Sequence, residues 1–272
     1  MTPVPPPARK HLGQNFLVDP NIVRKIVEAA ALTSEETVLE IGPGRGVLTR
    51  ALCAVTRRVQ AVEIDPRLCA YLREALADCP NLELYEGDAL HWPLDQLPQE
   101  SAVVANLPYY LSTPLLLRLL DARPRLSRAV VMLQAEVAHR LVARPGTKDY
   151  GSLSVAVQRA SEPRVLFRVS PNSFRPRPEV DSAVVSLTMC RSTLSVEVER
   201  VCQRLVRSAF AHRRKRVVNS LRDEGWSAEE IDLVRQALAP RPDRRAEEVS
   251  PAEFADIANR VAAWTGATGS DQ

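Results

Sequence analysis

Over its first half, this sequence repeats one order: a short apolar run, a turn, and then a helical pattern. The runs that are typical of strands are residues 37–41, 58–64, 82–85, 101–106 and 128–133. The helical patterns lie at residues 20–31, 47–54, 66–77 and after Ser112. Strands that alternate with helices in this way pair in parallel and carry helices on both faces of the sheet. The sequence therefore predicts an α/β fold with a doubly wound parallel sheet, whose ligands bind at the carboxyl ends of the strands.

The last part of the chain shows helical patterns only. The final strand-like run is residues 182–189, and helical patterns follow at 196–210, 217–223, 228–238 and 251–264. A length of 272 residues suits one large domain and a smaller one. We therefore expect a sheet domain at residues 1–190, which includes the N-terminal segment, and a small all-helical domain at residues 191–272.

Composition excludes several classes of protein. With 45% hydrophobic and 25% charged residues, the chain is neither disordered, nor collagen-like, nor a coiled coil. No apolar run reaches the roughly 18 residues that a membrane span needs. The N-terminus carries prolines and basic residues where a secretory signal needs an apolar core. We expect a cytoplasmic protein that acts as a monomer and has no membrane partner.

The cysteines and histidines indicate neither a disulfide framework nor a metal site. The five cysteines lie at least ten residues apart and form no C-x-x-C pair. The four histidines are scattered, and none lies in a local cluster with metal-ligand spacing. We expect no bound metal.

A glycine-rich turn, EIGPGRG, follows the first predicted strand and places Gly42, Gly44 and Gly46 before a helix. Glycine allows a ligand to approach the backbone closely and permits a positive φ, although such a turn also serves as a plain connection. Glu63 ends the next strand, 19 residues beyond Gly44. A carboxylate there can accept hydrogen bonds from the ribose hydroxyls of a nucleoside cofactor. Up to this point a dehydrogenase would look similar.

The end of the third predicted strand distinguishes a dehydrogenase from an enzyme whose nucleoside cofactor carries no phosphates. Asp88, in EGDAL, stands where a carboxylate can accept from an adenine amino group. Pro43 and Arg45 replace the small residues that a pyrophosphate requires, so a ligand without phosphates fits better. The sequence therefore predicts S-adenosylmethionine as cofactor and a Rossmann-like class I methyltransferase domain. Glu40 either contacts the methionine end of that cofactor or caps the glycine turn.

The fourth strand ends in Asn106, Leu107, Pro108 and Tyr109, which we predict to form the methyl-accepting site. An exocyclic adenine amine is a poor nucleophile because its lone pair is delocalised into the ring. If the Asn106 oxygen and a nearby main-chain carbonyl accept both N–H groups, the lone pair localises towards the methyl group, and no strong base is needed. Tyr109 can stack on an extruded base. Phe174, in SFRPRPEVDS, either contacts the same base or holds a rigid loop in place.

Basic residues concentrate in the predicted helical domain. Residues 200–222 contain seven Arg and one Lys but no Asp or Glu, which is typical of a surface that binds a polyanion, although a solvated helix face is the alternative. We expect RNA phosphates to contact the following side chains: Arg200, Arg204, Arg207, Arg213, Arg214, Lys215 and Arg216.

At these residues the chain resembles the KsgA-type ribosomal RNA adenine dimethyltransferases. The segments that carry the resemblance are LGQNFLVD at 12–19, EIGPGRGVLT at 40–49, VEIDPRL at 62–68, GDAL at 87–90, NLPYYLSTPLL at 106–116 and MLQAEVAHRL at 132–141. It continues through YGSLSVAVQ, SFRPRPEVDSAVV, FAHRRKRVVNSL and RAEEVSPAEFADIAN, and so spans nearly the whole chain. Where relatives often carry Asn after the N-L-P-Y tetrad, this chain has Tyr110, and we assign that residue no catalytic role.

The resemblance implies dimethylation of two adjacent adenosines near the 3′ end of 16S rRNA, in the small ribosomal subunit or its precursor, with a role in subunit biogenesis. It also implies that Asn15 and Leu17 close over the cofactor. Three other functions stay open: a related resistance methyltransferase that acts on large-subunit rRNA, an assembly factor in which methylation is secondary, and an adenine-specific DNA methyltransferase.

Overall fold

A computed structural model describes residues 3–9, 12–212 and 214–268. The chain divides into two compact units, Met1–His139 with Ser161–Cys190 and Arg140–Ala160 with Arg191–Gln272. The second unit therefore includes residues 140–160, which a single boundary at residue 190 leaves in the sheet domain. We describe each unit by itself.

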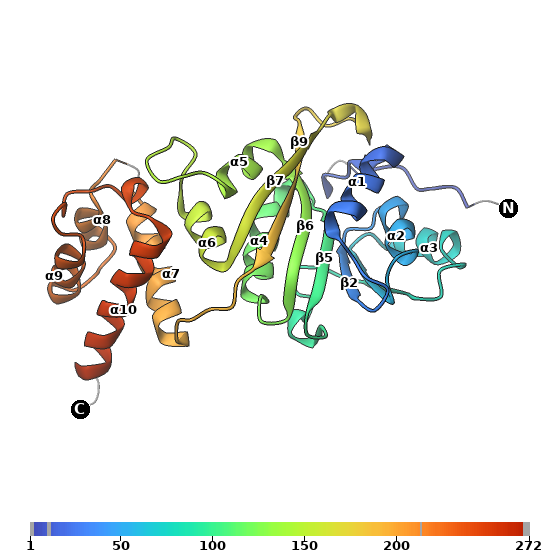
Figure 1. Ribbon diagram of the computed structural model, residues 1–272. Coiled ribbons are helices and arrows are strands. Elements are labelled where there is room, and N and C mark those ends of the chain that lie inside the picture. The colour runs from blue at the N-terminus through green and yellow to red at the C-terminus, as the bar shows by residue number, and fades with distance from the viewer. Residues whose placement is uncertain (1–2, 10–11, 213, 269–272) are drawn as a thin grey trace. The chain divides into compact units, whose positions relative to one another are not determined.

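The first unit is built on a seven-stranded sheet with the strand order β4-β3-β2-β5-β6-β9-β7 (Figure 1). Five strands run parallel, as predicted: β2 (Thr37–Ile41), β3 (Arg58–Glu63), β4 (Leu82–Glu86), β5 (Ser101–Asn106) and β6 (Leu126–Gln134). Two antiparallel strands complete the sheet, β9 (Ser182–Met189) and β7 (Ser161–Val169). The α/β prediction is confirmed, and β7 is an addition to it, because Pro163 and the consecutive apolar residues 165–167 interrupt the polar–apolar alternation by which a strand is recognised in the sequence.

Helices cover both faces of this sheet, as a doubly wound fold requires. One face carries α1 (Pro20–Ala30), α2 (Val47–Cys53) and α3 (Pro66–Ala75), and the other carries α4 (Ser112–Asp121) (Figure 1). Both α1 and α3 begin with a proline behind an aspartate cap, since Asp19 accepts from the amide of Asn21 and Asp65 from that of Arg67. The connections between these helices and strands are short, so the strand ends are held in fixed positions.

The N-terminal segment is attached to the first unit by a small second sheet. Strand β1 (Phe16–Leu17) pairs antiparallel with β8 (Phe174–Arg175), which follows the short helix η4 (Pro171–Ser173). The amide of Val18 also donates to the Ser173 carbonyl at 2.9 Å. Residues 12–17 are thereby held beside the strand ends that carry the predicted site.

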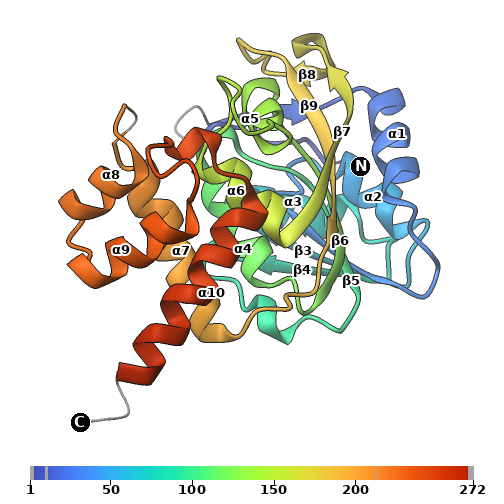
Figure 2. The ribbon, with the colours of Figure 1, turned by 60° about the vertical axis from the view of Figure 1, so that its left-hand side comes forward.

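The second unit is all-helical, as predicted for the C-terminal part of the chain. Its helices are α6 (Ser152–Ala160), α7 (Val196–Phe210), α8 (Val217–Asp223), α9 (Ala228–Ala237) and α10 (Pro251–Thr268) (Figure 2). The short helix α5 (Ala135–Leu141) contains the sequence boundary between the two units, which follows His139. Phe254, Leu205 and Val217 are fully buried in its core. Arg159 joins α6 to α7 through an ion pair with Glu199 at 3.0 Å.

Among the residues that the structure describes, no helix combines the length and apolar character needed to cross a bilayer. Within that same part of the chain, no group of three or more Cys, His, Asp or Glu side chains is arranged to hold a metal ion.

Candidate active site

One pocket lies at the carboxyl ends of β2, β3, β4 and β5 and beside the N-terminal segment. Ten of the residues predicted for cofactor or base line it: Asn15, Leu17, Gly42, Gly44, Glu63, Asp88, Asn106, Leu107, Pro108 and Tyr109. They come from four strand ends and from residues 12–17. The parallel sheet brings the four strand ends together at one edge. The pairing of β1 with β8 adds the N-terminal segment, so that Asn15 meets Asn106, 91 residues away in the sequence.

The glycine turn has the backbone conformation that the sequence predicts. Gly42, Gly44 and Gly46 have φ values of 69°, 59° and 77°, in the left-handed region. A Cβ atom on Gly44 would lie 3.0 Å from the ring of Phe16. The turn therefore requires glycine both for its conformation and for the approach of the N-terminal segment.

Glu63 is held rigidly at the end of β3 and is only 5% exposed. Its Oε2 accepts the amide of Gly44 at 3.2 Å, and its Oε1 accepts the amide of Asp65 at 3.0 Å. Burial raises the pKa of Glu63, and the two amide bonds oppose that rise. The carboxylate is thus a fixed acceptor in the pocket wall.

Glu40 is the buried acid of the pocket wall with an unsatisfied atom. It is 1% exposed, and its Oε2 has no hydrogen-bond partner among the described residues. Burial raises the pKa of Glu40 to about 8. A buried polar atom without a partner is costly, so this position favours a ligand or water that forms a hydrogen bond there.

Asp88 lies at the edge of the pocket, after the end of β4. Its Oδ1 accepts the amide of Leu90 at 2.8 Å, and its Oδ2 lies 3.2 Å from Nδ1 of His91. The side chain of Asp88 is 34% exposed, so its oxygens can accept a further donor from a ligand.

Asn106 connects the end of β5 to the N-terminal segment. Its Nδ2 donates to the main-chain carbonyl of Asn15 at 3.3 Å. Its Oδ1 is therefore the atom of the amide that is left to accept from a bound base. Tyr109 begins the short helix η3 (Tyr109–Leu111), and its hydroxyl lies 2.6 Å from Oγ of Ser182 at the start of β9. Burial raises the pKa of Tyr109, which keeps it a neutral phenol.

Phe174 requires a correction. Its side chain is 0% exposed and packs in the core of the first unit, beside Leu17 and Val184. A fully buried ring cannot contact an extruded base, so the structure gives Phe174 the packing role that was the alternative in the sequence. Its main chain pairs with Leu17, so it supports the segment that covers the pocket.

The predicted RNA-binding residues lie in two groups. Arg207 and Arg214 are exposed and form no ion pair with any residue that the structure describes. The others are paired: Arg200 with Glu197, Arg204 with Glu230, Lys215 with Asp223 and Arg216 with Asp243. Arg213 lies outside the described residues.

Arg204 is the most firmly held of these side chains. Its guanidinium lies 2.7 Å from the Glu230 carboxylate, and it stacks 4.1 Å above the ring of Trp226. These contacts join α7 to α9 within the second unit.

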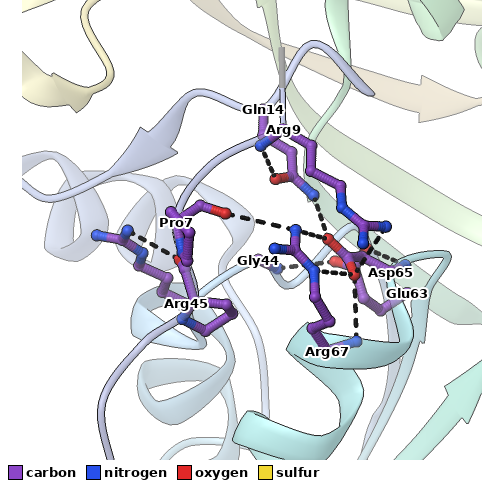
Figure 3. A network of polar contacts seen from close by, with 9 residues as sticks. Pro7, Arg9, Gln14, Gly44, Arg45, Glu63, Asp65 and Arg67 are labelled. Carbon is purple, nitrogen blue, oxygen red and sulfur yellow. Dashed lines mark hydrogen bonds and ion pairs between the residues drawn. The ribbon is translucent and has the colours of Figure 1, made fainter. Parts of the chain in front are cut away.

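A polar network beside the pocket was not predicted from the sequence. The side chain of Asp65 is fully buried and accepts from Gln14 at 3.1 Å and from Arg67 at 2.7 Å. Arg9 approaches it to 3.6 Å, and Arg45 donates to the carbonyl of Pro6 at 3.1 Å (Figure 3). Gln14 and Asp65 are 51 residues apart in the sequence, so no local pattern reveals the hydrogen bond between them.

The fold and the pocket define the class of the protein, a class I methyltransferase. Two solved structures share the fold over most of their length. A dimethyladenosine transferase from Plasmodium falciparum is 29% identical, covers 89% of this chain and 95% of its own, and has a TM-score of 0.75. A 23S rRNA methyltransferase, ErmE, is 29% identical, covers 91% of this chain and 99% of its own, and has a TM-score of 0.69. A methyltransferase of this class requires a methyl donor.

The family follows from the sequence comparison. The model of the ribosomal RNA adenine dimethylase family matches residues 7–263, and the chain belongs to that family. The ribosomal RNA small subunit methyltransferase A of Moorella thermoacetica is 47% identical in an alignment 266 residues long, which covers 93% of this chain and 92% of that protein.

Proposed function

We propose that this chain dimethylates the N6 amines of two adjacent adenosines near the 3′ end of 16S rRNA, within the small ribosomal subunit or its precursor. The observation that carries the proposal is the position of Asn106 at the end of β5, where its Oδ1 is free to accept while its Nδ2 is bound to Asn15. Membership of the adenine dimethylase family and 47% identity to a small-subunit enzyme support it.

S-adenosylmethionine is the methyl donor that suits the pocket. The ribose hydroxyls would donate to Glu63, the adenine amine to Asp88, and the methionine end would meet Glu40, directly or through water. The unsatisfied Oε2 of Glu40 fits such a donor. Asn15 and Leu17 would cover the cofactor. When bound, it supplies a methyl group activated by a sulfonium.

The acceptor amine is oriented by atoms of β5 and of the turn that follows. Asn106 Oδ1 and the carbonyl of Leu107 or Pro108 would accept its two hydrogens. These bonds draw the nitrogen towards tetrahedral geometry and direct its lone pair at the methyl group. Tyr109 would stack on the extruded base. No strong base is required, because the proton leaves after the nitrogen has become cationic.

The helical unit would hold the rRNA. Arg207 and Arg214 are exposed and form no ion pair with the residues that the structure describes, which suits phosphate contacts. The paired basic side chains between residues 200 and 216 would add to the positive field. We propose that the helical unit, residues 191–272 together with residues 140–160, binds rRNA, and that the rest of residues 1–190 forms the methyltransferase domain. We also propose that the enzyme acts in the cytoplasm as a monomer and contributes to subunit biogenesis.

A substrate comparison tests this function. The chain is incubated with labelled S-adenosylmethionine and, separately, with undermethylated small subunits, large-subunit rRNA and adenine-containing duplex DNA. We expect label in N6,N6-dimethyladenosine from small subunits only. Label in large-subunit rRNA alone would favour the activity that the ErmE name describes, and label in none of them would favour an assembly role.

A further inference from the structure

The main-chain carbonyl of Asn15 selects one of the two orientations that the Asn106 amide can take. The carbonyl is an acceptor, and it lies 3.3 Å from Nδ2 of Asn106. If the amide turned by 180°, two oxygens would face each other there, and Nδ2 would face the N–H groups of the base. The orientation that the carbonyl stabilises is the one that presents Oδ1 as an acceptor.

Gln14 in turn places that carbonyl. Its Nε2 donates to Oδ2 of Asp65 at 3.1 Å, and its Oε1 accepts the amide of Arg9 at 2.7 Å. Asn15 itself is half-buried, and among the residues that the structure describes its side chain donates to the nearby carbonyl of Gly13. The side chain of Gln14 therefore ties the main chain next to Asn15 to Arg9 and to Asp65 (Figure 3).

Asp65 is a rigid anchor for Gln14. Its side chain is fully buried, and it caps α3 by accepting the amide of Arg67. The guanidinium of Arg67, the amide of Gln14 and the cap lower the pKa of Asp65 to about 2. The carboxylate is thus ionised between pH 5 and pH 8.

We propose that Gln14 and Asp65 are positioning residues for methyl transfer: they fix the carbonyl of Asn15, which sets the amide of Asn106 so that Oδ1 meets the acceptor amine. This inference rests on the proposed function. In it the carbonyl of Asn15 acts on the amide that meets the acceptor amine, so loss of either side chain should lower turnover more than cofactor affinity.

An exchange of the amide of Gln14 and the carboxylate of Asp65 gives a specific test. Gln14→Glu keeps the size and the acceptor for Arg9, but sets a second carboxylate against Asp65. We expect kcat with small subunits to fall about tenfold at pH 8, with the dissociation constant of S-adenosylmethionine changed less than about threefold. In the double variant Gln14→Glu with Asp65→Asn, an amide again donates to a carboxylate, and asparagine also caps a helix. We expect kcat to return to within about threefold of the wild-type value.

The pH profile provides a second readout. As pH falls, the introduced carboxylate takes up a proton and can donate to Asp65, so the Gln14→Glu defect should shrink towards pH 5. The charged groups around this position are Asp65, Arg9 and Arg67, and Glu63 lies behind Asp65, whose amide it accepts at 3.0 Å. Asp65, with a pKa of about 2, stays ionised over that range, and the wild type measured at each pH accounts for Glu63. Gln96→Glu, an exposed glutamine in η2 (Leu94–Gln96), adds the same charge away from the pocket and should change nothing.

The side-chain amide signals of Asn106 in ¹⁵N NMR, identified by their loss in Asn106→Ala, test the placement without substrate. We expect them to shift in Gln14→Glu and to return in the double variant. Wild-type kcat in Gln14→Glu, additive losses in the double variant, or a loss of cofactor affinity equal to the loss of kcat would overturn the inference. If the wild type transfers no methyl group, the proposed function fails, and the NMR signals still decide whether the pair places Asn106.

Discussion

The main-chain amide of Gly44 lies 3.2 Å from Oε2 of Glu63, across 19 residues of sequence. This bond ties the glycine turn after β2 to the end of β3. It orients the carboxylate before any ligand arrives, so little side-chain entropy remains to be lost on binding.

Glu63→Ala should weaken the binding of S-adenosylmethionine. The loss is on the order of 1.5–3 kcal/mol for each charge-assisted hydrogen bond to the ribose, before compensation by water. Titration calorimetry measures the affinity. The matched control is Glu86→Ala, since Glu86 is the register partner of Glu63 on β4 but does not line the pocket. Equal affinity for the wild type and Glu63→Ala would show that the second strand end does not hold the nucleoside.

Glu40 should make the free energy of unfolding fall as pH rises. Its carboxyl titrates near 4.5 in an unfolded chain and near 8 in the folded one, so between these values the folded state binds more protons. The contribution is favourable below pH 4.5 and is lost progressively up to pH 8. Glu40→Gln should therefore show a flatter decline between pH 5 and pH 8.5 in urea unfolding. Parallel pH profiles for the two proteins would exclude a buried, protonated Glu40.

Phe174→Ala should lower the free energy of unfolding. Removal of a fully buried phenylalanine costs about 3–5 kcal/mol, and Phe174→Leu should recover much of that loss. Because Phe174 pairs with Leu17, hydrogen exchange in residues 12–17 should also become faster. A variant with unchanged stability and reduced turnover would instead return Phe174 to the base-binding site.

Substitution of the exposed arginines of α7 and the following loop should change RNA binding, whereas substitution of the paired Arg204 should change stability. Arg207→Gln with Arg214→Gln should flatten the log–log salt dependence of small-subunit binding by roughly 1.4–1.8, which is 0.7–0.9 for each phosphate contact. Arg204→Gln should instead lower the stability of the helical unit by about 1 kcal/mol, through its contacts with Glu230 and Trp226. An unchanged salt dependence in the double variant would make this surface a solvated helix face.

Local patterns predicted most of the sheet and the pocket. Pro20 and Pro66 mark helix starts that the structure places at those residues. Glu63, Asp88 and Asn106 each follow a strand pattern, and parallel pairing alone brings such strand ends together.

What the sequence could not predict depends on contacts between distant residues. The two-residue pairing of Phe16 and Leu17 with β8 has no periodicity to detect, and it decides that Phe174 is buried. Residues 140–160 follow the sheet in sequence, yet Tyr150 is buried in the helical core and donates to the carbonyl of Val249 at 2.8 Å.

The number of methyl groups transferred per particle tests the central claim most directly. Undermethylated small subunits are treated with excess S-adenosylmethionine, and their nucleosides are quantified by mass spectrometry, with Asn106→Ala as the inactive control. A pocket that admits an amine already carrying one methyl group should give four methyl groups per particle, as two N6,N6-dimethyladenosines. Monomethyladenosine as the only end product, or full transfer by Asn106→Ala, would contradict the account.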